Sequence, residues 1–155
     1  MDYTPANFKI GACAATLGST ALGGTEGNCN LKHEPIYYES KCDQGGEQVI
    51  RKVIRSFKTI LEIPMKEIDL AFDQILDENK KITTALIGTD ILTTGQALTL
   101  TPVDSNDDKG YSFPKAVLLP EIDYTPDGSK DHVMTLKFEI HPDDNGDIIE
   151  RTTIV

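Results

Sequence analysis

The sequence predicts a mainly β protein, an antiparallel β-sandwich or barrel with one flanking α-helix. About eight segments alternate apolar and polar residues between turns rich in Gly, Pro and Asp, whereas one segment shows helical periodicity. Many strands with a lone helix are typical of sheet-on-sheet folds. At 155 residues the chain is long enough to bury a core, and 1–155 is expected to be a single domain.

The two longest predicted strands follow one another, at 29–42 and 49–63, joined by a tight polar link. Strands are usually about five or six residues long, so this hairpin should outreach the core, with its loop around 35–50 protruding. Pro35 inside the first arm indicates an edge strand or a bulge, with a bend near that residue. Near the tip, both faces mix Ile or Val with Lys or Arg, which favours contact with a second chain.

A single segment, 66–79, predicts a helix, because its apolar residues recur along one stripe. These residues are Ile68, Ala71, Phe72, Ile75 and Leu76. Pro64 is expected to end the preceding strand, and the helix should cover an open face of the sheet. The other predicted strands lie at 7–14, 20–27, 83–87, 96–101, 112–122, 132–141 and 148–155, with turns at 124–131 and 142–147.

Two of the predicted strands carry apolar faces that should be buried. The second arm of the hairpin has an apolar face at its core end, formed by Phe57, Leu61 and Ile63. The strand at 132–141 alternates, with Met134, Leu136, Phe138 and Ile140 on one side.

The formal net charge is −10, from 25 acidic and 15 basic residues. This balance argues against a protein that grips nucleic acid through its phosphates, although it also fits ordinary colloidal solubility. No window approaches the roughly 18 apolar residues that cross a bilayer, and the first residues lack the pattern of a signal peptide. We therefore expect residence in a reducing cytoplasm.

Catalytic and metal-binding patterns are missing from the sequence. The cysteines have no C-x-x-C spacing and are expected to be small buried hydrophobes: Cys13, Cys29 and Cys42. The histidines lie far apart: His33, His132 and His141. The acidic stretch 143–147 fails as a calcium loop, because His141 and Thr152 would occupy its first and last ligand positions. No catalytic, cofactor or metal site is predicted, and we expect a protein that is not an enzyme.

Several short motifs follow one another in the first third of the chain. Residues 22–27 read LGGTEG, 29–35 read CNLKHEP and 37–44 read YYESKCDQ. The order of these motifs resembles the major tail tube proteins of tailed bacteriophages. In that family an L-G-x-T-x-G element precedes an acidic x-E-P-x-Y strand and a D-Q turn. The stretch FEIHPDDNG at 138–146 is similar to the family's late F-x-(apolar)-x-P-D-x-x-G ending. The cysteines at 29 and 42 depart from the pattern.

The resemblance implies a structural virion protein with a β-sandwich and a flanking helix. Six copies would form a ring, and stacked rings would form the tail tube through which DNA is ejected, passing an electronegative lumen without specific binding. Tape measure and tail completion or terminator proteins would be further partners, with no membrane and no cofactor, and assembly would take place in the host cytoplasm. Six hairpin residues are expected to contact the next subunit or ring: Tyr37, Tyr38, Lys41, Asp43, Gln44 and Glu47.

Two alternatives remain open. The chain could be the tube protein of a contractile injection system, which would share the fold and differ in cargo. It could instead be a β-sandwich module that binds a carbohydrate or a host surface. Such a module would need a concave aromatic platform, for which ten Phe and Tyr and no Trp give little support.

Overall fold

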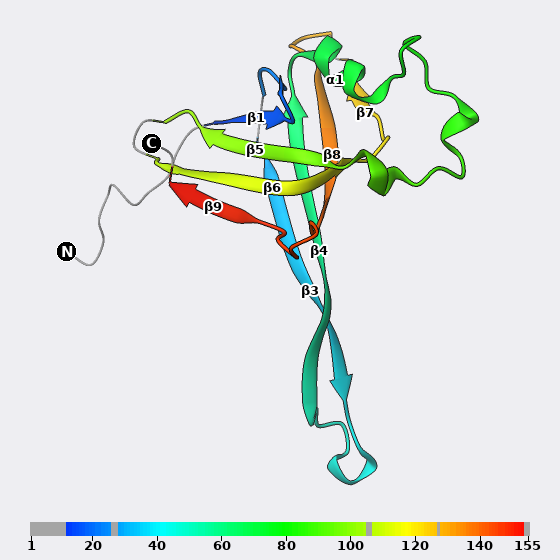
Figure 1. The fold of residues 1–155 in the computed structure, drawn as a ribbon, viewed down its shortest axis with the longest axis vertical. Coiled ribbons are helices and arrows are strands. Elements are labelled where there is room, and N and C mark those ends of the chain that lie inside the picture. Colours follow the sequence, from blue (N-terminus) through cyan, green and yellow to red (C-terminus); the bar gives the residue numbers. More distant parts are fainter. Residues whose placement is uncertain (1–11, 26–27, 105–106, 127, 154–155) are drawn as a thin grey trace, which may run out of the picture.

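The computed structural model describes residues 12–25, 28–104, 107–126 and 128–153, which form one nine-stranded antiparallel sheet and one α-helix. The predicted mainly β class with one helix is confirmed. The strands are β1 (Cys13–Leu17), β2 (Thr20–Ala21), β3 (Asn30–Ser40), β4 (Arg51–Met65), β5 (Gln96–Pro102), β6 (Lys109–Leu118), β7 (Asp123–Thr125), β8 (Val133–His141) and β9 (Glu150–Thr153). The helix is α1 (Ile68–Ile75), and 3-10 turns lie at η2 (Asp43–Gly45), η3 (Thr84–Leu86) and η4 (Ile91–Thr94) (Figure 1).

Strand β6 joins two layers of this sheet. One side of β6 pairs with β5, while the other side pairs with β9 over residues 109–112 and with β8 over residues 115–118. One layer is therefore β2-β1-β5-β6-β9, and the other contains β7, β8, β4 and β3. Figure 1 shows β5 and β6 crossing β4 and β8 rather than running along them. This is the arrangement of an orthogonally packed sandwich, in which one strand passes from layer to layer.

The core lies between the two layers. The layer of β1, β5 and β6 contributes Ala15, Leu17, Leu98, Leu100, Phe113 and Ala116. The layer of β4 and β8 contributes Leu61, Ile63, Met65, Met134, Leu136, Phe138 and Ile140. The predicted alternation of β8 is confirmed, because every second residue of that strand is buried.

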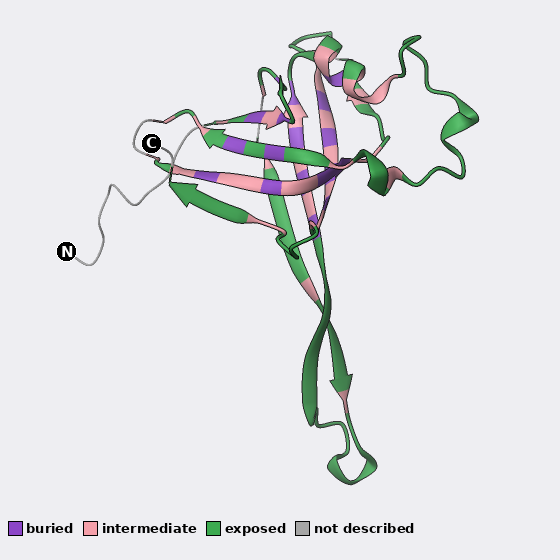
Figure 2. Ribbon diagram, viewed as in Figure 1, coloured by how far each residue is buried: buried purple, intermediate pink, exposed green. Residues whose placement is uncertain are grey.

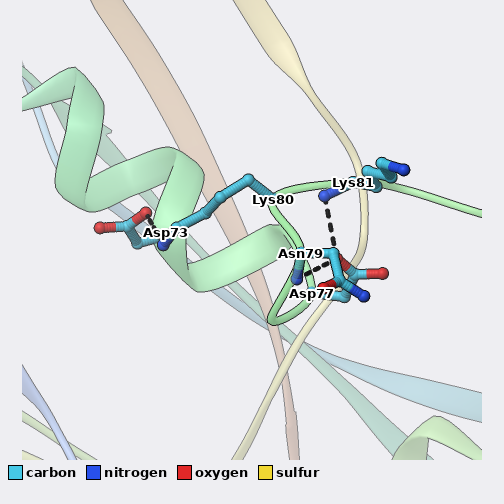
Figure 3. A network of polar contacts seen from close by, with 5 residues as sticks. All are labelled: Asp73, Asp77, Asn79, Lys80 and Lys81. Carbon is cyan, nitrogen blue, oxygen red and sulfur yellow. Dashed lines mark hydrogen bonds and ion pairs between the residues drawn. The ribbon is translucent and has the colours of Figure 1, made fainter.

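The helix is shorter than the predicted span 66–79, because a side-chain-capped turn competes with its last part. Oδ1 of Asp77 accepts hydrogen bonds from the backbone N–H of Asn79 at 2.9 Å and of Lys81 at 2.9 Å. Lys80 takes a left-handed φ of 59° and forms an ion pair with Asp73 at 2.7 Å (Figure 3). Aspartate bonds of this kind favour turns over helix interiors. The predicted apolar stripe does pack against the core, with Ala71 fully buried.

Pro64 and one predicted strand differ from expectation. Pro64 does not end β4, which continues to Met65. The backbone N–H of Lys66 donates to the carbonyl oxygen of Gly24. The nitrogen of Pro64, two residues earlier in the strand, faces the same edge of β4, where the pairing with β3 has already ended at Glu62. Pro114 lies inside β6, at a bulge where proline removes no ladder hydrogen bond. The predicted strand 83–87 is the turn η3, because the Thr83 hydroxyl accepts from the backbone N–H of Ala85 at 3.3 Å.

Several predicted ranges extend outside the described residues, namely 7–14, 20–27, 124–131 and 148–155. Their described parts contain the start of β1, the short β2, the end of β7 and the whole of β9. Strand β6 begins at Lys109, before the predicted start at residue 112, because its first residues, 109–112, pair with β9.

Candidate assembly surface

The hairpin of β3 and β4 is the one long element that leaves the two-layered body. Strand β8 pairs with β4 only from Thr59 to Met65, and β3 has β4 as its strand neighbour at the sheet edge. Residues of β4 before Thr59 are therefore paired only within the hairpin. At about 3.4 Å per residue, the stretch 51–58 extends roughly 27 Å beyond the sheet. Figure 2 shows that this part is exposed along almost its whole length.

A polar contact fixes the root of the hairpin where it meets the body. Nδ1 of His33 lies 2.6 Å from Oγ1 of Thr59, whose side chain is only 2% exposed. The His33 ring also stacks on Phe57, with ring centroids 5.0 Å apart. Phe57 was predicted to be buried but is half exposed, because β8 ends opposite Thr59 and leaves it uncovered.

A β-bulge separates the root from the outer half of the hairpin. Ile36 pairs with Ser56 and Tyr37 pairs with Ile54, so Arg55 is an extra residue on β4. The predicted bend near Pro35 therefore corresponds to an irregularity two residues further along. Bulges bend a strand and increase its twist, so this one directs the outer half of the hairpin.

The outer half has two different faces, each with its own cation. Tyr37 and Glu39 share one face with Lys52, whose Nζ lies 4.4 Å from the Tyr37 ring centroid and 3.4 Å from Oε1 of Glu39. Tyr38 lies on the opposite face with the Arg55 guanidinium 5.9 Å from its ring centroid. Such cross-strand contacts contribute roughly 0.2–1 kcal/mol each, which supports a hairpin that has no core beneath it.

The hairpin carries most of the exposed apolar surface of the described chain. Among the described residues, fifteen large apolar side chains are exposed, and nine of the fifteen lie on this hairpin. They are Leu31, Ile36, Tyr37, Tyr38, Val49, Ile50, Val53, Ile54 and Phe57. A two-stranded hairpin is marginally stable alone in water, and a large exposed apolar patch marks a contact surface. The outer hairpin is therefore the strongest candidate for an interface.

The structure places all six predicted contact residues on this outer half, and all six are exposed. Lys41 and Glu47 form an ion pair at 3.3 Å, while Asp43 and Gln44 lie in η2 at the tip. Tyr37 and Tyr38 occupy opposite faces, so they do not form one aromatic platform of the kind a carbohydrate module needs. The prediction omitted the apolar residues of β4, although their mixture with Lys and Arg was visible in the sequence.

The thiols differ in their surroundings. Cys13 and Cys29 are half-buried and pack against the core, as expected. Burial raises the pKa of the Cys13 thiol, with a smaller contribution from Asp107. Burial also raises the pKa of the Cys29 thiol, with a smaller contribution from the nearby Cys13. Cys42 was predicted to be buried but is exposed, because it lies at the hairpin tip beyond the reach of the core.

The three histidines lie in three separate contacts. His33 bonds to Thr59, His132 Nδ1 lies 2.6 Å from the Tyr124 hydroxyl, and His141 Nε2 lies 2.8 Å from Glu139 Oε1 without hydrogen-bond geometry. In the described part of the chain, no three potential metal ligands gather in one place. Within the same residues, no helix combines the length and apolar character needed to cross a membrane.

Comparison with protein-family models and with curated proteins finds no match. The architecture is shared with solved structures that include the following two. One is a chain of the PVC sheath-tube complex of an extracellular contractile injection system in its extended state, with a TM-score of 0.55, 8% identity, and coverage of 99% of this chain and 94% of that chain. The other is the tube-terminating cap of the anti-feeding prophage, with a TM-score of 0.55, 9% identity, and coverage of 98% and 96%. This chain has the fold of a tail tube protein.

The comparison supports the resemblance at the level of the tube-protein fold. One structure is of a sheath-tube complex and the other of a tube-terminating cap, and each match extends over almost the full length of both chains. The expected link to tailed bacteriophages in particular is not part of this finding. At identities of 8% and 9% the likeness concerns the fold.

Proposed function

We propose that the protein is a structural subunit that self-assembles into stacked rings and forms the tube of a phage tail or of a contractile injection system. The observation that carries this proposal is the projecting hairpin, with nine exposed large apolar side chains and no strand of the body beside its outer half. The fold shared with a chain of a sheath-tube complex and with a tube-terminating cap supports the same role.

The proposed mechanism is geometric, and no bond is made or broken. The whole chain acts as one tube-forming domain, and rings of six copies enclose a lumen. Residues Tyr37, Tyr38, Lys41, Asp43, Gln44 and Glu47 contact the next subunit or ring. The net charge of −10 on every copy supports a lumen that repels DNA, so that DNA passes without binding. Tape measure and terminator proteins would close the assembly, which would form in the host cytoplasm.

A second candidate role is the terminal cap of such a tube. The likeness to the anti-feeding prophage cap favours it, with the same TM-score of 0.55 as the sheath-tube match. A tube subunit repeats its contact indefinitely, whereas a cap must stop after one ring. The two roles therefore differ in whether the purified protein elongates.

Negative-stain electron microscopy of concentrated protein tests this proposal. A tube subunit should give rings and long tubes, and a cap should give single rings. The double charge reversal Lys41→Glu with Asp43→Lys should abolish these assemblies while leaving the monomer folded, because both residues are exposed. Stable monomers at every concentration would count against the proposed function. Normal assembly by the charge-reversed variant would count against the proposed interface.

A further inference from the structure

Charge is divided unevenly between the hairpin and the rest of the chain. The projecting part of the hairpin, residues 36–58, contains five basic and three acidic residues, a net charge of +2 in a chain of net charge −10. Lys41 and Lys52 are paired with Glu47 and Glu39 inside the hairpin. The remaining three cations have no ion pair in the described chain and face solvent: Arg51, Arg55 and Lys58. The hairpin is thus an apolar, basic surface on an acidic protein.

The opposite end of the long axis has the complementary charge. Residues 66–95, from α1 to the start of β5, contain six acidic and three basic residues, a net charge of −3. Two of the three cations are ion-paired, Lys80 with Asp73 and Lys66 with Asp131. Figure 1 shows α1 and the loop that follows it at the end of the molecule away from the hairpin tip.

An apolar groove lies between this loop and the body. It consists of two adjoining hollows of about 200 Å³ and 270 Å³, which share Ile75 of α1 and Leu86 of η3. Their further apolar lining is Leu17, Ile82, Ile91, Leu118 and Pro120, and the acidic Asp77 and the basic Lys81 also line the second hollow. A cavity of about 150 Å³ holds a benzene ring, so each hollow has room for one large apolar side chain.

We infer that this groove, which we name the Leu86 groove, receives the hairpin tip of the next copy of this chain. The inference rests on the proposed function, and it adds the surface to which the hairpin binds. Ile50 is the most exposed large apolar residue of the hairpin, at 59%, and enters the groove. The neighbouring Arg51 then faces Asp77, the acidic residue of the second hollow. Apolar burial supplies the contact, and charge complementarity selects its orientation.

The geometry makes this contact head-to-tail. The hairpin tip lies at the opposite end of the molecule from α1 and the loop after it (Figure 1), whose residues line the Leu86 groove, so a copy uses its tip on one neighbour and its groove on another. A contact between two different surfaces leaves both free at the ends of any assembly, which then grows until it closes or continues as a filament. Repetition along the long axis stacks one ring upon the next.

Cysteine cross-linking tests the inference, because the native Cys42 already lies exposed at the hairpin tip. Ala85→Cys places a second thiol in the lining of the groove without removing a large side chain. Val103→Cys is the matched control, since residue 103 is exposed and outside the groove. With a short bismaleimide, the assembled Ala85→Cys variant should give at least tenfold more cross-linked dimer than the Val103→Cys variant. Adding Cys42→Ser should abolish the difference.

The outcomes separate this inference from the proposed function. If micrographs show rings or tubes while Ala85→Cys cross-links no better than Val103→Cys, the Leu86 groove is not the receptor and the proposed function stands. If the unchanged protein forms no assembly at any concentration, the proposed function fails and this inference fails with it. A charge reversal Arg51→Glu should lower the cross-link yield several-fold, whereas Lys58→Glu, at the hairpin root, should leave it unchanged.

Discussion

The contact between His33 and Thr59 allows a prediction about the free energy of unfolding, because only the Thr59 side of the contact is buried. His33→Ala removes the partner of the buried Thr59 hydroxyl, which has no other hydrogen bond in the described structure. An unsatisfied buried hydroxyl costs about 1–3 kcal/mol, and loss of the ring contact with Phe57 adds roughly 0.2–1 kcal/mol. The variant should therefore lose about 1–4 kcal/mol. Thr59→Val should lose only about 1 kcal/mol, because the exposed His33 can bond to water instead.

The double variant gives the sharper result. Once His33 is alanine, changing Thr59 to Val removes the unsatisfied hydroxyl, so the double variant should be more stable than His33→Ala alone. Urea denaturation with equal m values measures the four free energies of unfolding, and the double-mutant cycle isolates the coupling. Thr99→Val, on the exposed face of β5, is the control and should change stability by less than about 0.5 kcal/mol in either background. A second loss on adding Thr59→Val to His33→Ala would refute the reasoning.

Three further predictions concern burial, the turn after α1 and the thiols. Phe138→Ala should cost about 3–5 kcal/mol because its ring is fully buried, while Phe57→Ala should cost much less; equal losses in urea denaturation would contradict this. Asp77→Ala removes the acceptor of two backbone N–H groups and should cost about 1 kcal/mol. Faster amide hydrogen exchange at Asn79 and Lys81, with the rest of the sheet unchanged, is the expected readout. At neutral pH a maleimide should modify Cys42 first, because the raised pKa values of the other two thiols keep them protonated; mass spectrometry showing Cys13 or Cys29 modified before it would oppose this.

The predicted contact residues show how much of the assembly surface can be predicted from local sequence patterns. The excess length of the two arms and the position of Pro35 were visible in the sequence, and the structure has both long strands and a bulge beside that proline. The separation of Tyr37 and Tyr38 onto opposite faces follows from strand alternation. By contrast, the Leu86 groove is assembled from β1, α1, the turns after it and β6. No spacing within one segment indicates a surface built from four distant ones.

The sequence by itself determined the antiparallel class, the buried face of β8 and the two long strands, because alternation and turn residues act between neighbours in the chain. It also contained the reason for the early end of α1, since Asp77 lies two and four residues before the N–H groups it binds. Only the tertiary structure decided which apolar residues remain in solvent. The exposure of Phe57 and Cys42 follows from where β8, some 80 residues further along the chain, stops pairing with β4. Burial depends on such distant partners, and their register follows from the packing of the two layers.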